Sequence, residues 1–130
     1  GDADYFAVFT DVVLPLAESF QPDFVLVSAG YDCAAGDLLG CFDVSSEGFR
    51  MLTRLLICAT GSDVVVPMIL VLEGGYDLED TSEEPHSPLC KGVQATIEGL
   101  FEGPAFAHDL PVGWRNDVRP ETFEVIAQVS

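Results

Sequence analysis

Apolar residues recur at helical spacing in the first twenty residues of the chain. Five of them fall on one face that a helix would bury: Phe6, Phe9, Val13, Leu16 and Phe20. Pro15 lies within this stretch and has no backbone N–H to donate, so we expect a kink there. The pattern therefore predicts a kinked amphipathic helix over residues 2–20.

Two later segments are apolar without alternation, a pattern typical of strands covered on both faces. They are Phe24–Val27 and Met68–Leu72. Between them, Ser45 is a candidate N-cap for a helix whose apolar face continues to Ala59. Strand, helix and strand in this order predict two parallel strands joined by a right-handed crossover.

The rest of the chain predicts loops and two further helices. Residues 31–44, rich in glycine, aspartate and small side chains, predict a loop. Residues 77–84 carry five carboxylates, and we interpret them as a solvated loop or helix entry. A third helix is expected over Ser87–Phe101, and a short closing helix begins near Glu121.

A parallel sheet of such strands has helices above and below it and contains more than two strands. Because this sequence offers two confident strands, we expect the chain to be the carboxyl-terminal part of a larger α/β domain. Residues 1–103 would belong to that domain, and residues 104–130 would form an irregular tail over its surface. The start at Gly1, without a signal-peptide pattern, is expected of a processed chain or a piece of a longer one.

Composition excludes several classes of protein. A hydrophobic share of 48% over 130 residues excludes a disordered chain. The 22 acidic and 5 basic residues give a net charge of −17, which disfavours direct binding to nucleic acid or to an anionic membrane. No apolar run approaches the roughly 20 residues of a membrane span. The four cysteines lack the spacing of a disulfide scaffold or zinc finger, which favours reduced thiols in an intracellular protein.

Chemistry in an open α/β sheet is expected outside the carboxyl ends of its strands. The segment Ser28–Asp37 follows the first predicted strand, and Glu73–Tyr76 follows the second. Since neighbouring parallel strands end at the same rim, these two segments should lie side by side. The sequence therefore predicts one site built from both.

Two residues of these segments have chemical and structural interpretations that the pattern leaves open. Asp37 precedes an apolar pair and needs a partner, which a metal such as zinc would supply; alternatively, Asp32 or Asp37 caps a turn by accepting backbone N–H groups. Tyr76 follows two glycines, which allow a sharp turn and the close passage of a substrate chain. Its phenol would donate to a developing oxyanion, or its ring would form a lid over the core.

At these residues the sequence resembles the zinc-dependent histone deacetylase family, and looks closest to its class II branch. Ordered motifs carry the resemblance: Gly1-Asp2-Ala3-Asp4-Tyr5, Val13-Leu14-Pro15, the stretch from Pro22 to Asp37, and Leu72-Glu73-Gly74-Gly75-Tyr76. It covers residues 1–103 and is looser in the tail. The resemblance implies an arginase/deacetylase-like three-layer fold, a parallel sheet with flanking helices, present here only as its carboxyl-terminal portion. It also implies zinc-dependent hydrolysis of the acetyl amide of lysine.

The resemblance also implies roles for single residues. Asp37 matches a zinc ligand, and Tyr76 matches the catalytic tyrosine that polarises the acetyl carbonyl and stabilises the oxyanion. Gly74 and Gly75 match glycines beside the acyl-lysine tunnel, and Val44 falls at its rim. The family's other zinc ligands and its paired histidines are expected upstream. With one carboxylate ligand, these 130 residues alone should bind zinc weakly and hydrolyse nothing.

Two alternatives to a lysine deacetylase stay open. One is an acetylpolyamine or related amide hydrolase, since a negative charge attracts cationic protein tails and polyamines alike. The other is a truncated, non-catalytic interaction module that exposes apolar sheet faces. Under the leading interpretation the expected partners are acetylated lysine-containing proteins such as histone tails, together with corepressor proteins. The expected location is the nucleus, the cytoplasm or both.

Overall fold

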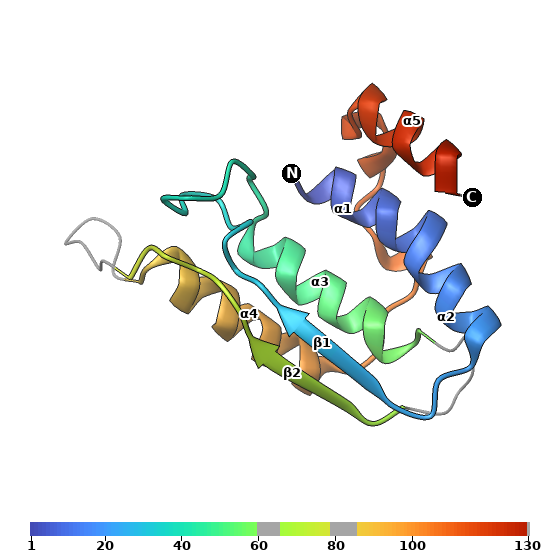
Figure 1. Cartoon of the computed structure of the whole chain (residues 1–130), viewed down its shortest axis with the longest axis horizontal. Helices are drawn as coiled ribbons and strands as arrows, with labels where there is room; N and C mark the ends of the chain where they lie inside the picture. The colour runs from blue at the N-terminus through green and yellow to red at the C-terminus, as the bar shows by residue number, and fades with distance from the viewer. Residues whose placement is uncertain (60–65, 79–85, 130) are drawn as a thin grey trace.

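The first predicted helix forms over residues 2–20, and the stretch divides into three consecutive pieces. In the computed structural model, which describes residues 1–59, 66–78 and 86–129, α1 spans Asp2–Val8, a π-helical segment spans Phe9–Val13 and α2 spans Leu14–Phe20. Figure 1 shows α1 leading into α2 along this stretch. The expected disturbance near Pro15 is therefore a π-helical turn directly ahead of it. Pro15, which has no N–H to donate, lies in the first turn of α2, directly after the π-helical segment.

Two parallel strands follow the predicted order. β1 spans Val25–Ala29 and β2 spans Met68–Leu72, with Val27 opposite Leu70 in the register. Between them α3 spans Ser46–Ile57, and its N-cap Ser45 accepts a hydrogen bond from the backbone of the first turn. The parallel pairing, the second strand and the second helix are confirmed as predicted.

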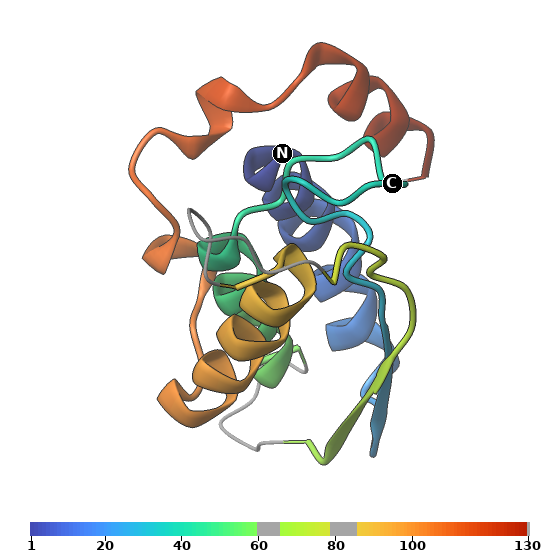
Figure 2. The same cartoon turned by 90° about the vertical axis from the view of Figure 1, so that its left-hand side faces the viewer.

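One face of this two-stranded sheet is covered and the other is exposed. Figure 2 shows α3 and α4 (Pro88–Glu102) on one side of the sheet. On the opposite side Leu26, Ile69 and Val71 are exposed. The apolar runs had predicted strands covered on both faces, and within the described residues this holds for one face only. The α/β class with a parallel sheet and flanking helices is confirmed.

The helices α3 and α4 pack closely because small residues face the partner helix. A Cβ atom placed on Gly99 would lie 2.7 Å from the carbonyl oxygen of Arg50, so the two backbones approach there as only glycine allows. The guanidinium of Arg50 also pairs with Glu102 across the two helices. The third predicted helix is thus confirmed, with Ser87 as its N-cap.

The carboxyl-terminal segment returns to the first helix. It contains two short 3₁₀ turns, Ala107–Asp109 and Trp114–Asp117, before α5 spans Pro120–Val129. The Trp114 ring meets the Phe6 ring edge-on, with centroids 5.9 Å apart. The predicted closing helix is confirmed. Ala105 and Leu110 of this carboxyl-terminal segment share a buried core with α1 and α3. The domain boundary between residues 103 and 104 stays a prediction.

Asp4 is a buried carboxylate that joins α1 to the start of α5. It accepts hydrogen bonds from the Arg119 backbone, the Arg119 Nε and the Thr122 hydroxyl, at 3.0, 2.9 and 2.7 Å, and from the terminal amine of Gly1 at 2.9 Å. Burial alone would raise the pKa of Asp4, but these hydrogen bonds lower it well below its usual range. The carboxylate therefore stays charged where the two helices meet.

Part of the acidic segment lies outside the described residues. Of its residues 77–84, the structure describes only Asp77 and Leu78, so its interpretation as a solvated loop or helix entry stays a prediction. Among the helices that the structure describes, none is both long and apolar enough to span a membrane.

Candidate active site

The two predicted site segments meet at the rim where the strands end. The last strand pair is Ala29 and Leu72, and the backbone N–H of Glu73 continues the ladder by donating to the Ala29 carbonyl at 3.0 Å. Beyond this point the chain turns through residues 30–44 on one side and 74–78 on the other. The rim predicted from the order of strands is confirmed.

Asp37 lies at the centre of this rim, and its carboxylate holds both segments. Its Oδ1 accepts backbone N–H groups from Leu39 and Gly40, at 2.9 and 3.0 Å. Its Oδ2 accepts the N–H groups of Tyr76 and Asp77, at 2.6 and 3.3 Å. The alternative in which Asp37 caps a turn is therefore confirmed for Oδ1, while Oδ2 reaches across to the other segment.

These hydrogen bonds determine the charge of the Asp37 side chain. The N–H of Tyr76, followed by that of Gly40, lowers the pKa of Asp37 to about 2, because each hydrogen bond favours the ionised carboxylate. The residue is 9% exposed. Asp37 is therefore a fixed, largely buried anion at the rim.

The two glycines before Tyr76 adopt conformations that other residues rarely reach. The φ angles of Gly74 and Gly75 are +77° and +105°. A Cβ atom on Gly74 would lie 3.2 Å from Cγ of Asp32, and one on Gly75 would lie 2.7 Å from Cδ1 of Leu89. The sharp turn predicted from these glycines is confirmed, and it passes tightly over its neighbours.

Tyr76 has a fixed backbone and an accessible side chain. Its N–H is bound by Asp37, whereas the residue is 52% exposed. An exposure of this size leaves the ring open to solvent, which disfavours the alternative of a lid over the core. The phenol is available at the rim as a hydrogen-bond donor.

Val44 lies in the core, 1% exposed, and not at an open rim. Its backbone forms a parallel bridge with Ala34, and its Cγ1 lies close to the first turn of α3 at Gly48. Its side chain therefore packs inward beneath the loop. This burial does not support the tunnel-rim position that the resemblance implied for Val44.

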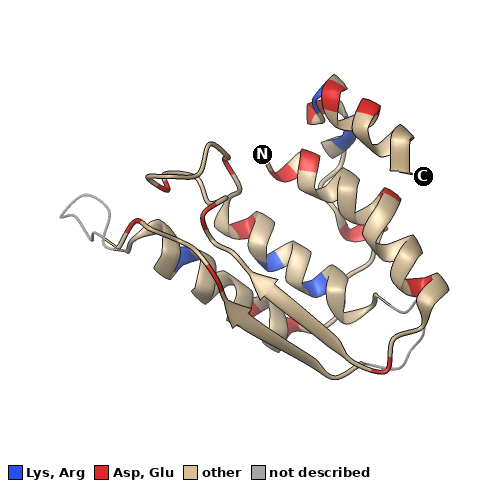
Figure 3. Cartoon of the chain, viewed as in Figure 1, with Lys and Arg blue, Asp and Glu red and all other residues tan. Residues whose placement is uncertain are grey.

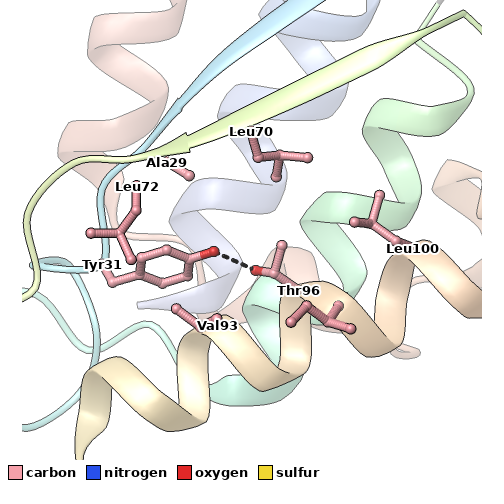
Figure 4. Close-up of a pocket in the computed structure, with 8 residues that line it drawn as sticks. Ala29, Tyr31, Leu70, Leu72, Val93, Thr96 and Leu100 are labelled. Carbon is pink, nitrogen blue, oxygen red and sulfur yellow. Dashed lines mark hydrogen bonds between the residues drawn. The ribbon is translucent and has the colours of Figure 1, made fainter.

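Sequence reasoning missed Tyr31, which lies directly beneath the Gly74–Tyr76 turn. Tyr31 is 4% exposed, and its hydroxyl donates to Oγ1 of Thr96 on α4 at 3.0 Å (Figure 4). The signal that could have found it is the pair Gly92 and Thr96, four residues apart on one face of a helix, where a small residue leaves room for an aromatic ring.

The described residues do not form a zinc site by themselves. Over residues 1–59, 66–78 and 86–129 there is no group of three or more His, Cys, Asp and Glu side chains placed to hold a metal ion. A catalytic zinc normally has three protein ligands, and among the rim carboxylates Asp37 is the one that the family resemblance matched to a ligand. Both oxygens of that carboxylate already accept backbone N–H groups.

Comparisons with known proteins agree on one family. The sequence model of the histone deacetylase domain matches residues 1–89. Histone deacetylase 15 of Arabidopsis thaliana is 48% identical over 112 residues, which are 77% of this chain and 20% of that protein. Polyamine deacetylase HDAC10 of Homo sapiens is 44% identical over 97 residues, 75% of this chain and 13% of that protein. The chain thus spans a fifth or less of these curated relatives.

A solved structure resembles the whole described arrangement. The crystal structure of the HDA15 HD domain superposes with a TM-score of 0.74 and 33% sequence identity. The match covers 99% of this chain and 31% of that chain. The packing of the two strands and five α-helices is therefore similar to part of that domain.

Proposed function

This chain belongs to the histone deacetylase family, and we propose that it takes part in hydrolysing the acetyl amide of acetylated lysine. The observation that carries the proposal is the 2.6 Å hydrogen bond from the Tyr76 N–H to Asp37 Oδ2. It places a fixed anion and a phenol donor at one rim. The resemblance had matched Asp37 to a zinc ligand and Tyr76 to the catalytic tyrosine.

Tyr76 would act on the substrate through its hydroxyl. When water attacks the acetyl carbonyl, negative charge develops on the carbonyl oxygen. A phenol donor held next to that oxygen stabilises the charge more in the transition state than in the ground state. Asp37 binds the Tyr76 N–H, and the two preceding glycines have positive φ angles. Together they fix the position of the Tyr76 backbone, from which the phenol extends.

We propose that Asp37 contributes one ligand to a zinc ion and that the remaining ligands come from sequence outside these 130 residues. The proposal is supported by the ionised state of Asp37, since a carboxylate ligand binds a metal in its charged form. The low share of each relative that the chain covers leaves room for further ligands.

The charge of the chain favours a cationic substrate. Acidic residues spread over the helices and loops, with few basic ones (Figure 3). The two site segments themselves carry Asp32, Asp37, Glu73 and Asp77. A negative field at the rim raises the local concentration of lysine-rich tails. We propose acetylated proteins such as histone tails as substrates, corepressor proteins as partners, and the nucleus or cytoplasm as the location.

Acetylpolyamines are the second candidate substrate. The 44% identity with a protein named polyamine deacetylase supports this candidate, and a polyamine is as cationic as a histone tail. The third candidate function is a non-catalytic interaction module. The exposed apolar sheet face with Leu26, Ile69 and Val71 supports it. Turnover measured on acetyl-lysine and acetylpolyamine substrates distinguishes these candidate functions.

The experiment places residues 1–129 in the HDA15 HD domain in exchange for the segment that they match; we call this protein the grafted domain. Its turnover is measured on an acetyl-lysine peptide and on N-acetylspermidine, beside the 130-residue chain alone. We expect chelator-sensitive turnover of the peptide by the grafted domain and none by the chain alone. Preference for acetylspermidine would favour the second candidate. A grafted domain that folds cooperatively, binds zinc and hydrolyses neither substrate would contradict a catalytic role.

A further inference from the structure

Tyr31 occupies a position between the sheet, α4 and the turn that carries Tyr76. It follows Gly30 directly at the end of β1, and its ring is tilted against the Phe49 ring of α3, with centroids 5.1 Å apart. Its hydroxyl donates to Thr96 Oγ1 at 3.0 Å, in a buried hydrogen bond between residues 65 positions apart (Figure 4). Tyr31 therefore links the site rim to α4.

The turn lies directly on this side chain. A Cβ atom on Gly75 would be 3.1 Å from Cβ of Tyr31 and 2.7 Å from Cδ1 of Leu89. On α4, a Cβ atom on Gly92 would be 2.6 Å from Cδ1 of the Tyr31 ring. Glycines thus allow both the turn above and the helix below to touch Tyr31, and a shift of Tyr31 would reach Gly75.

Packed side chains do not surround the Tyr31 ring completely, although the residue is only 4% exposed. The ring borders a cavity of about 340 Å³ between the sheet and α4, whose other lining residues include Leu70, Leu72 and Val93 (Figure 4). An aromatic ring beside such a space is held by its remaining contacts. The Thr96 hydrogen bond is the directional contact that fixes the end of the ring.

We propose that Tyr31 is a positioning residue for Tyr76, and that its hydrogen bond to Thr96 fixes the support on which the Gly74–Gly75 turn rests. Asp37 holds the Tyr76 N–H from one side, and Tyr31 supports the turn from the other. The role rests on the proposed function of Tyr76, but the support itself is a property of the fold. It therefore has a readout that needs no turnover.

The test is amide hydrogen exchange of Tyr76, measured by NMR on the ¹⁵N-labelled full chain. Tyr31→Phe removes the hydroxyl and keeps the ring, and Thr96→Val removes its partner. We expect both to speed exchange of the Tyr76 amide about tenfold, the equivalent of one hydrogen bond, relative to the Leu55 amide in the core of α3. Thr96→Ser, which keeps the hydroxyl, should restore protection.

Tyr5→Phe is the matched control, because Tyr5 also has a hydrogen-bonded hydroxyl, with Cys33 as its partner. It should leave the Tyr76 exchange ratio unchanged. The proposal is overturned if Tyr31→Phe and Thr96→Val leave that ratio at its wild-type value, or if Tyr5→Phe changes it equally. Should Tyr31→Phe not fold, the comparison of Thr96→Val with Thr96→Ser decides in the same way.

Kinetics of the grafted domain provide the catalytic readout. There Tyr31→Phe should lower kcat about tenfold with KM unchanged, since it displaces a transition-state donor and leaves substrate binding alone. If the grafted domain is inactive, the proposed function fails while the exchange result still decides the role of Tyr31. A normal kcat together with normal exchange would refute the positioning role.

Discussion

The carboxylate of Asp37 binds the backbone N–H of Tyr76 at 2.6 Å, although the two residues are 39 positions apart. The same carboxylate also closes its own loop through Leu39 and Gly40. The Asp37 side chain thus fixes the geometry of its own loop and the backbone position of Tyr76. A substitution at Asp37 is therefore expected to alter the geometry of the segment that carries Tyr76, whether or not a metal is bound.

Asp37→Asn should loosen both segments of the rim. The asparagine amide has one acceptor oxygen, and its NH₂ group faces N–H donors that the carboxylate had bound. Amide exchange at Leu39, Gly40 and Tyr76 should become faster, as measured by NMR. Asp43→Asn, an exposed change in the same loop, serves as the control and should leave these amides as they were. Unchanged exchange at Tyr76 in Asp37→Asn would show that Asp37 does not hold the turn.

Gly75→Ala should destabilise the chain more than Gly103→Ala. Both glycines have positive φ angles, +105° and +82°, so both substitutions strain the backbone. A Cβ atom on Gly75 meets Leu89 at 2.7 Å, whereas one on Gly103 has no atom within 4 Å. We expect Gly75→Ala to cost about 1–3 kcal/mol more in the free energy of unfolding, measured by urea denaturation. Equal costs would mean that the turn is not tightly packed.

The stability contributed by Asp4 should depend on pH. Its pKa is lowered in the folded state, so its contribution is fully present above the unfolded value of about 3.9 and is lost as the pH falls below it. The groups that face Asp4 are the Gly1 amine, Arg119 and the Thr122 hydroxyl, and the two cations keep their charge throughout this range.

Urea denaturation of the wild type and of Asp4→Asn measures this contribution. At pH 7 the wild type should be more stable by about 2 kcal/mol, the size of hydrogen bonds to a charged group. The difference should shrink steadily below about pH 4. Thr53→Val, which removes a hydroxyl that donates to the Phe49 carbonyl on α3, should show no such pH dependence. A difference that stays constant down to pH 2 would contradict the role of the Asp4 charge.

Local signals in the sequence predicted most of the elements. Ser45 was a recognisable N-cap because a serine before an apolar helical face satisfies a free N–H, and it does so. Ser87 was predicted as the first residue of the third helix and is its N-cap. Met68–Leu72 was predicted to the residue, whereas the first strand is shifted from Phe24–Val27 to Val25–Ala29. Its end is set by pairing with the second strand, which a single segment does not reveal.

Features that depend on distant partners could not be predicted. The π-helical turn ahead of Pro15 depends on a choice between hydrogen-bond patterns that apolar spacing does not distinguish. The rim was predictable because strand order places Asp37 and Tyr76 together, but the burial of Val44 depends on how the loop folds onto α3. Tyr31 was missed because its partner Thr96 lies on a helix whose placement comes from tertiary packing.

The most direct test of the account is the turnover number of the grafted domain on an acetyl-lysine peptide, with Tyr76 intact and with Tyr76→Phe. Since Tyr76 is half exposed, the substitution should change the free energy of unfolding by less than about 0.5 kcal/mol. We predict a loss of about 10²–10³ in kcat, the usual effect of removing one oxyanion donor. A Tyr76→Phe variant that keeps its wild-type kcat would contradict the claim that this chain supplies the catalytic phenol.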